Sequence, residues 1–119
     1  MIAAHVAKHG HKLVTPTVHM MRHWWARINR EVFDGLLMPC QLSVGDLSAH
    51  AAQGLCWPLD SGRVKIEVDP TWATSRVAFL SILAHEMTHQ YQHQNGLGLT
   101  HGPTFTGWAD HFKALGLSI

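Results

Sequence analysis

His85-Glu86-Met87-Thr88-His89 lies in the middle of the longest apolar-periodic segment of the chain, residues 77–94. Residues four apart on a helix are separated by about 40° around the axis and about 6 Å along it. The two imidazoles therefore project from one face and can bind one metal ion. Glu86 follows His85 directly, so its carboxylate is expected beside the metal, as the general base for a metal-activated water.

The residues that precede this motif decide between a metal site and an ordinary surface helix. Residues 77–84 read Val-Ala-Phe-Leu-Ser-Ile-Leu-Ala, apolar nearly all round, which is typical of a buried helix. Two histidines and a glutamate that continue a buried helix need partners, because unpaired buried charge is costly. A metal supplies them. Two neutral imidazoles suit zinc, so the expected cofactor is Zn²⁺, one ion per chain.

A catalytic zinc usually has three protein ligands and one open position, so a third ligand is expected downstream. Position 95, where the metzincin pattern has a histidine, is Asn95. Glu86 is the last glutamate of the chain, which excludes a thermolysin-like set with a downstream glutamate. The remaining downstream candidates are His93, His101, Asp110 and His111.

His101 is favoured among these candidates by its position, together with the resemblance described below. It lies beyond the predicted helix stop at Asn95-Gly96 and just before Gly102-Pro103, which can open another helix. A loop residue ahead of a returning helix can reach back over the motif. Asp110 is kept as the fallback ligand. His93 is expected as a solvated helix-end residue, since it lies two turns beyond His85 on the motif helix.

Composition and charge limit the classes of function. The chain has 119 residues, of which 46% are hydrophobic and 14% charged, as expected for one globular domain. Nine basic and eight acidic residues give a net charge of +1 without any Lys/Arg run, so no electrostatic footprint for nucleic acid is visible. Cys40 and Cys56 form no C-x-x-C pair and are expected as buried, reduced thiols.

No apolar run approaches the roughly 20 residues that a membrane span needs. The N-terminal stretch lacks a continuous signal-peptide core, because it is interrupted by His5, Lys8, His9, Gly10 and His11. We therefore expect no membrane partner and a cytoplasmic location.

The rest of the chain predicts a small α+β domain. Residues 1–16 are expected as a mobile, His-containing N-terminal lead-in, and residues 17–119 as the domain itself. Thr17 can cap an N-terminal helix that runs to about Phe33. Further elements are expected as three strands at 41–45, 54–57 and 64–68, the motif helix at about 75–95 and a C-terminal helix at about 103–115. Asp60-Ser61-Gly62 predicts a hairpin turn between the last two strands. The short sheet would pack on the motif helix, with an active-site cleft between the helix and the sheet edge.

Several short motifs occur together along this chain. They are Val32–Leu37 before the first strand, Gly54, Ile66–Val68 with Pro70, Leu83–His89, and His101–Phe105. In this combination the chain resembles the SprT-like family of zinc metalloproteases, over about residues 17–115. The discriminating feature is H-G-x-x-F after H-E-x-x-H, and in that family its histidine, here His101, is the third zinc ligand. The resemblance implies a minimal zincin-like fold and peptide-bond hydrolysis by zinc at His85, His89 and His101, with Glu86 as base.

Two features of many family members are not visible in this sequence, namely a C-terminal Cys-rich zinc ribbon and DNA-binding segments. The chain therefore resembles a minimal form. The expected partner is a protein or peptide substrate, and the DNA association that the family implies is not supported by charge.

Two alternatives stay open. A zinc-stapled binding module would use the metal without turnover. A DNA-associated accessory protein would contact a strand through Trp24, Trp25 and Trp57. Glu86 argues against the first, because a purely structural site needs no general base. The near-zero net charge argues against the second.

Overall fold

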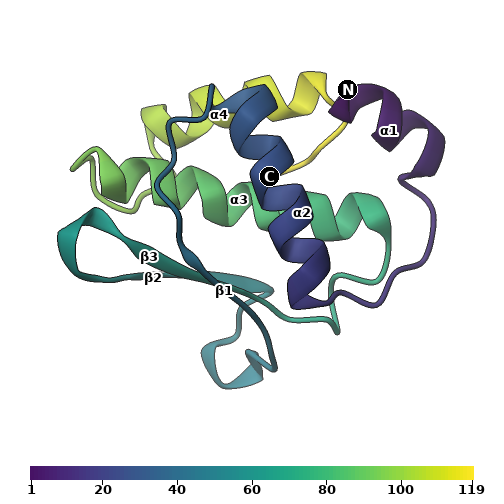
Figure 1. Ribbon diagram of the computed structural model, residues 1–119, viewed down its shortest axis with the longest axis horizontal. Helices are drawn as coiled ribbons and strands as arrows, with labels where there is room; N and C mark the ends of the chain where they lie inside the picture. The colour runs from purple at the N-terminus through teal and green to yellow at the C-terminus, as the bar shows by residue number, and fades with distance from the viewer.

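Helix α3, Arg76–Gln94, runs through the middle of the molecule and carries the histidine motif (Figure 1). The structure is a computed structural model that describes residues 1–119. A three-stranded sheet packs against α3 on one side. Helices α2 (Val18–Val32) and α4 (Pro103–Ala114) pack against it elsewhere, so α3 contacts most other elements of the fold.

The sheet has the strand order β1-β3-β2, with β3 in the centre. The strands are β1, Gln41–Val44, β2, Gly54–Pro58, and β3, Val64–Val68. β3 runs antiparallel to β2 and parallel to β1. The three predicted strands are confirmed, and so is the hairpin, whose turn contains a short 3₁₀ helix at Asp60–Gly62. In β3 the apolar residues Val64, Ile66 and Val68 alternate with Lys65 and Glu67, and all three are fully buried.

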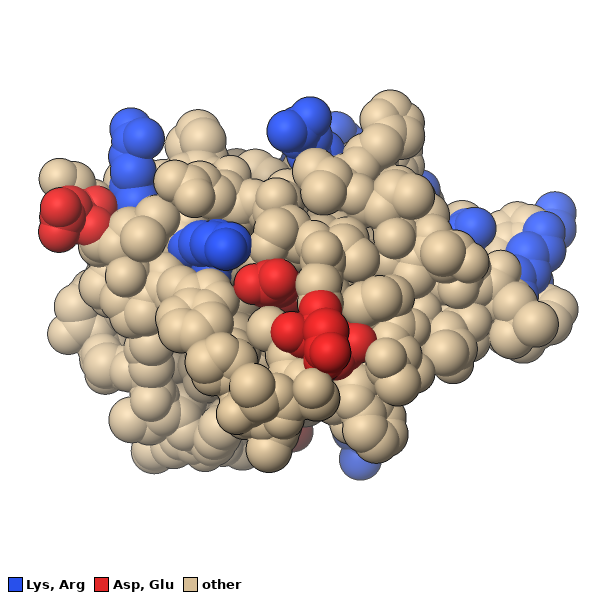
Figure 2. All heavy atoms as spheres, turned by 90° about the horizontal axis from the view of Figure 1, so that it is seen from below, with Lys and Arg blue, Asp and Glu red and all other residues tan.

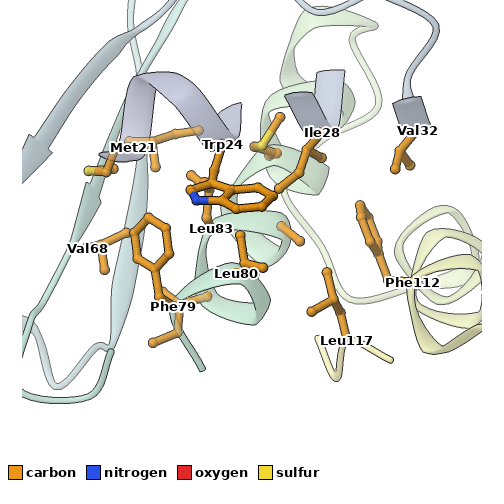
Figure 3. Packing of buried hydrophobic residues seen from close by; sticks show 14 of the residues in the cluster. Met21, Trp24, Ile28, Val32, Val68, Phe79, Leu80, Leu83, Phe112 and Leu117 are labelled. Carbon is orange, nitrogen blue, oxygen red and sulfur yellow. The ribbon is translucent and has the colours of Figure 1, made fainter. Parts of the chain in front are cut away.

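The predicted helices are also confirmed, with the expected cap at Thr17 and a further cap at Ser75 that was not predicted. The Thr17 hydroxyl accepts a hydrogen bond from the backbone N–H of Met20 at 3.1 Å, and the Ser75 hydroxyl accepts one from that of Ala78 at 3.2 Å. α2 presents buried side chains at spacings of three and four toward α3, and Figure 3 shows them above Leu80 and Leu83. These side chains belong to Met21, Trp24, Ile28 and Val32. Phe112 and Leu117 close the other end of this core (Figure 3).

The N-terminal segment differs from the mobile lead-in that was expected over residues 1–16. Residues Ile2–His9 form helix α1, in which Ile2 is only 2% exposed and donates its N–H to the carboxylate of Glu31 at 3.2 Å. Backbone hydrogen bonds from Val14 to Thr74 and from Arg76 to Lys12 join the following residues to the start of α3. An isolated helix of eight residues is unstable in water, so this one depends on tertiary packing that its sequence alone does not reveal. The domain boundary at residue 17 stays a prediction.

Charged side chains are few on the surface and scattered. On the face in Figure 2, Lys and Arg residues are separated by uncharged surface, and several acidic residues gather near the middle. This distribution agrees with the net charge of +1 and contains no continuous basic stripe on that face. None of the helices is both long and apolar enough to cross a lipid bilayer.

Candidate metal centre and active site

His85 and His89 project from the same face of α3, as their spacing predicts. Their ring centroids lie 4.9 Å apart, with the rings nearly perpendicular at 75°. The motif occupies a part of α3 that is buried on most sides, and Glu86, Met87, Thr88 and His89 are all buried. Polar groups in such a position need partners, and their partners define the site.

His101 completes a cluster with these two histidines. α3 ends at Gln94, and Gly96 and Gly98 adopt positive φ angles of 69° and 77° that turn the chain back toward the helix. The Nε2 atom of His101 consequently lies 3.3 Å from Nε2 of His85. One ring nitrogen of each of the three histidines lies within 4.8 Å of the others. The loop residue favoured by position is therefore the one that the fold brings to the motif.

The ring of Phe105, in the first turn of α4, contacts all three imidazoles. Its ring centroid lies 4.8 Å from that of His85, 5.0 Å from that of His89 and 4.7 Å from that of His101. Phe105 is itself buried, so the rings rest on a rigid apolar surface. Sequence analysis named this residue as the last position of the H-G-x-x-F motif. Its contact with the whole cluster gives the phenylalanine of H-G-x-x-F a physical role.

Hydrogen bonds fix which ring nitrogen of His85 and His89 faces the cluster. Nδ1 of His85 lies 2.7 Å from the backbone oxygen of Ile119, which can only accept, so Nδ1 carries the proton. Nδ1 of His89 lies 2.8 Å from Oε1 of Gln92, while Nε2 of that amide donates to the Thr100 carbonyl at 2.9 Å. Both histidines therefore leave Nε2 unprotonated, with its lone pair available to a metal.

Gln92 and Ile119 are site residues that sequence analysis missed. Gln92 follows His89 by three positions, which places both on one side of a helix, and a glutamine on an otherwise buried helix was the available signal. Ile119 gives no such signal, because its approach to His85 depends on the path of the chain after α4. Ser118 is held there by a hydrogen bond from its N–H to the Ser81 hydroxyl at 3.2 Å.

Burial governs the protonation of the site. It lowers the pKa of His85 and of His89, and the neighbouring His101 lowers both further, which favours the neutral imidazoles that bind metals. Burial also raises the pKa of Glu86, which is 6% exposed, to about 7. Oε2 of Glu86 lies 4.0 Å from Nε2 of His85, beside the histidine cluster and outside it.

The donor set fits a zinc ion. Zn–N bonds of about 2.0–2.1 Å at tetrahedral angles separate ligand nitrogens by about 3.3 Å. The observed separation between Nε2 of His85 and Nε2 of His101 is 3.3 Å. Three neutral imidazoles would hold such an ion and, with no fourth protein ligand in the cluster, would leave one position for water or substrate, as in catalytic zinc sites.

The other downstream candidates lie outside the cluster. His93 points toward the turn of the β2–β3 hairpin, with Nε2 at 3.4 Å from the Leu59 carbonyl oxygen. Asp110 and His111 are exposed on α4. The fallback carboxylate of Asp110 is therefore not brought to the motif.

A cavity of about 570 Å³ opens beside His85 and Glu86. Its walls come from the first half of α3, from the start of β2 and from the residues that follow α4. Gly54 allows β2 to approach this closely, because a Cβ there would lie 2.8 Å from Cγ2 of Ile82 and 3.1 Å from Cγ of Glu86. The cleft expected between the motif helix and the sheet is present, and the Glu86 side chain forms part of its wall.

Comparison with known proteins gives one family. Residues 21–118 match the SprT-like family, a stretch that includes α3, the His101 loop and α4. No curated protein matches the chain. The mixed α+β architecture is consistent with the minimal zincin-like fold that the motifs imply. Since the match covers nearly the whole chain and contains all three clustered histidines and Glu86, the protein belongs to the SprT-like family.

Proposed function

We propose that this protein is a zinc-dependent metallopeptidase that hydrolyses peptide bonds. His85, His89 and His101 would hold one zinc ion, and Glu86 would act as general base. The observation that carries the proposal is the buried carboxyl of Glu86, which lies beside a three-histidine cluster and in the wall of a cavity large enough for a peptide segment. A metal-binding module without turnover has no use for such a carboxyl.

Each residue has a distinct part in the proposed reaction. A bound zinc ion supplies a Lewis acid that polarises the scissile carbonyl and lowers the pKa of water. Glu86 accepts the proton of the attacking water on its carboxylate and then delivers it to the nitrogen of the leaving amine. Its raised pKa, about 7, suits a group that must both take up and release a proton near neutral pH. Gln92 and Ile119 hold His89 and His85 with Nε2 toward the metal.

The proposed substrate is a protein or peptide, without a requirement for DNA. The net charge of +1 gives little overall attraction for a phosphate backbone, and the Lys and Arg residues on the face in Figure 2 are scattered and form no continuous basic stripe. Salt-sensitive DNA binding, measured as a slope that reflects several phosphate contacts, would instead support the alternative of a DNA-associated protein.

The test begins with metal content. Mass spectrometry of the purified protein should find about one zinc per chain in the wild type and sharply less in His101→Ala. Hydrolysis of an unfolded protein should then fall about 10²- to 10⁴-fold in Glu86→Gln, with zinc content unchanged. Glu67→Gln is the matched control, because Glu67 lies on β3, where it pairs with Lys65 at 3.7 Å.

Two results would overturn the proposal. Absence of zinc from the wild type would remove the metal site. Full hydrolysis by Glu86→Gln would remove the general base. A third pattern, in which zinc is bound and needed for folding while no substrate is cleaved, would establish the zinc-stapled module instead.

A further inference from the structure

The cavity beside Glu86 has walls that carry almost no charge. Its volume of about 570 Å³ is in the range of ordinary ligand pockets, about 300–1,000 Å³. Thirteen residues line it, and the only ionisable ones among them are His85 and Glu86, which the proposed reaction already uses. An anionic group that entered this space would lose water without finding a cationic Lys or Arg side chain, and the only carboxyl side chain that a cation would meet is Glu86, which the proposed reaction needs.

Small side chains on α3 create the depth of the cavity. Ala78 and Ser81 are three residues apart, so they line the same face of the helix, and Val77 and Ile82 flank them. The Ser81 hydroxyl already accepts a hydrogen bond from the N–H of Ser118. It therefore joins the segment after α4 to the helix, and Gly116, Ser118 and Ile119 of that segment form an adjoining part of the wall.

Trp72 lies at the cavity and exposes a large apolar surface. Its side chain is 55% exposed, although it belongs to one of the residue types that gain most from burial. An apolar group held in the cavity would cover part of this indole. Trp72 thus offers apolar contact area to a ligand in the cavity.

The position of Glu86 indicates which part of a peptide would enter. In the proposed reaction Glu86 gives its proton to the leaving nitrogen, so the residue that carries this nitrogen lies on the side of Glu86. The cavity is on that side, because Glu86 forms part of its wall. The side chain next to the leaving nitrogen is therefore the one placed at the cavity mouth.

We propose that this cavity is a specificity subsite for a large apolar side chain, such as Leu, Met or Phe, on the residue that follows the scissile bond. The proposal rests on the proposed function and adds a substrate class to it. Replacing Ala by Leu at that position should raise kcat/KM about 10- to 100-fold, the range that burial of one apolar side chain provides. Lys and Glu at the same position should be cleaved at least as poorly as Ala.

The first experiment uses a series of peptides that differ only at this position, with Ala, Leu, Phe, Lys or Glu. The zinc-loaded wild type should prefer Leu and Phe. Ala78→Leu places a larger side chain in the cavity and should bring the ratio of Leu to Ala cleavage close to one. Ala26→Leu, the same substitution on the exposed surface of α2, should keep the wild-type ratio. Equal cleavage of all five peptides, or a preference for Lys or Glu, overturns the subsite.

A second experiment separates the subsite from catalysis. Calorimetric binding of the same peptides to zinc-loaded Glu86→Gln measures recognition without turnover. Tighter binding of the Leu and Phe peptides, abolished by adding Ala78→Leu, supports the subsite even where the wild type cleaves nothing and the proposed function fails. Binding that does not depend on the varied residue overturns the subsite even where the wild type is an active peptidase.

Discussion

Gln90 and Gln92 lie two residues apart on α3, and each is only 1% exposed, yet they hold different parts of the molecule together. Gln90 accepts a hydrogen bond from the Trp25 indole at 3.0 Å and donates one to the Met38 carbonyl at 2.8 Å. Gln92 bridges His89 and the Thr100 carbonyl in the same way. Residues two apart point to nearly opposite sides of a helix. One side of α3 therefore organises the scaffold, and the other organises the candidate site.

Gln90 and Gln92 thus have different roles because their side-chain amides bind different partners. In both glutamines the side-chain oxygen and nitrogen each have one hydrogen-bond partner, so burial and hydrogen bonding alone do not distinguish them. The two hydrogen bonds of Gln92 link His89, a candidate metal ligand on the helix, to Thr100, the residue that precedes His101. Gln92 therefore connects the positions of two candidate ligands. The Gln90 bridge joins α2 and the segment before β1 to α3. Matched substitutions at the two positions should therefore separate metal binding from stability.

The largest effect is expected for zinc affinity in Gln92→Leu. This change substitutes an apolar side chain of similar size and removes both hydrogen bonds of Gln92. The His89 ring and the loop that carries His101 are then no longer linked through this side chain. Loss of a group that orients a ligand typically weakens metal binding about 10- to 100-fold. Competition with a chromophoric chelator measures this affinity directly. Gln92→Glu, which retains an acceptor for His89 Nδ1, should recover part of the loss.

The matched variant Gln90→Leu is the control for this result. Its zinc affinity should stay within about twofold of the wild type. Equal losses of zinc affinity in the two variants would show that the site responds to general loosening of α3, and the distinction between the two sides would not hold.

A smaller effect is expected for stability in Gln90→Leu. The change leaves the Trp25 indole N–H and the Met38 carbonyl without their partner in a partly buried region. An unsatisfied buried polar group costs about 1–3 kcal/mol, so the free energy of unfolding should fall by an amount near the lower end of this range. Urea unfolding of the metal-free protein measures it, followed by Trp fluorescence. Combining the change with Trp25→Phe removes the indole donor as well and should recover part of the loss. No recovery would contradict a role for this hydrogen bond.

The same comparison marks what sequence could predict. Helical spacing places His85 and His89 together, and a Gly-rich loop before a helix start favours His101, since both are local consequences of the chain. The alternation of Val64, Ile66 and Val68 likewise predicts their burial. These parts of the fold and the site depend on periods of two and 3.6 residues, which are read directly from the sequence.

The parts that sequence missed depend on contacts between distant segments. The Gln92 bridge requires the loop to return with the Thr100 carbonyl turned toward α3, and the His85 partner requires the chain after α4 to fold back. Helix α1 is too short to be stable alone and is fixed by burial of Ile2. The parallel pairing of β1 with β3 joins strands that are not consecutive in the sequence, and no local sequence pattern predicts it. In each case tertiary packing decides the structure.

The smallest expected effect is the change that Gln90→Leu makes in the reactivity of Cys40, which lies two residues after Met38 on the Gln90 side. Burial raises the pKa of Cys40 and of Cys56 to about 12, so very little thiolate exists near neutral pH. At pH 8 iodoacetamide should alkylate both thiols about three orders of magnitude more slowly in the folded protein than in urea, and the folded rate should rise with pH. Gln90→Leu loosens the Met38 segment and should speed the reaction of Cys40 about three- to tenfold by local opening.

Gln92→Leu should leave the Cys40 rate near that of the zinc-loaded wild type, and Cys56 on β2 serves as the internal reference in every sample. Mass spectrometry of the alkylated peptides gives both rates from one reaction. Faster labelling of Cys40 in Gln92→Leu than in Gln90→Leu would reverse the assignment of the two sides. A wild-type rate equal to that in urea would mean that the thiol is not held away from water, because only burial raises its pKa.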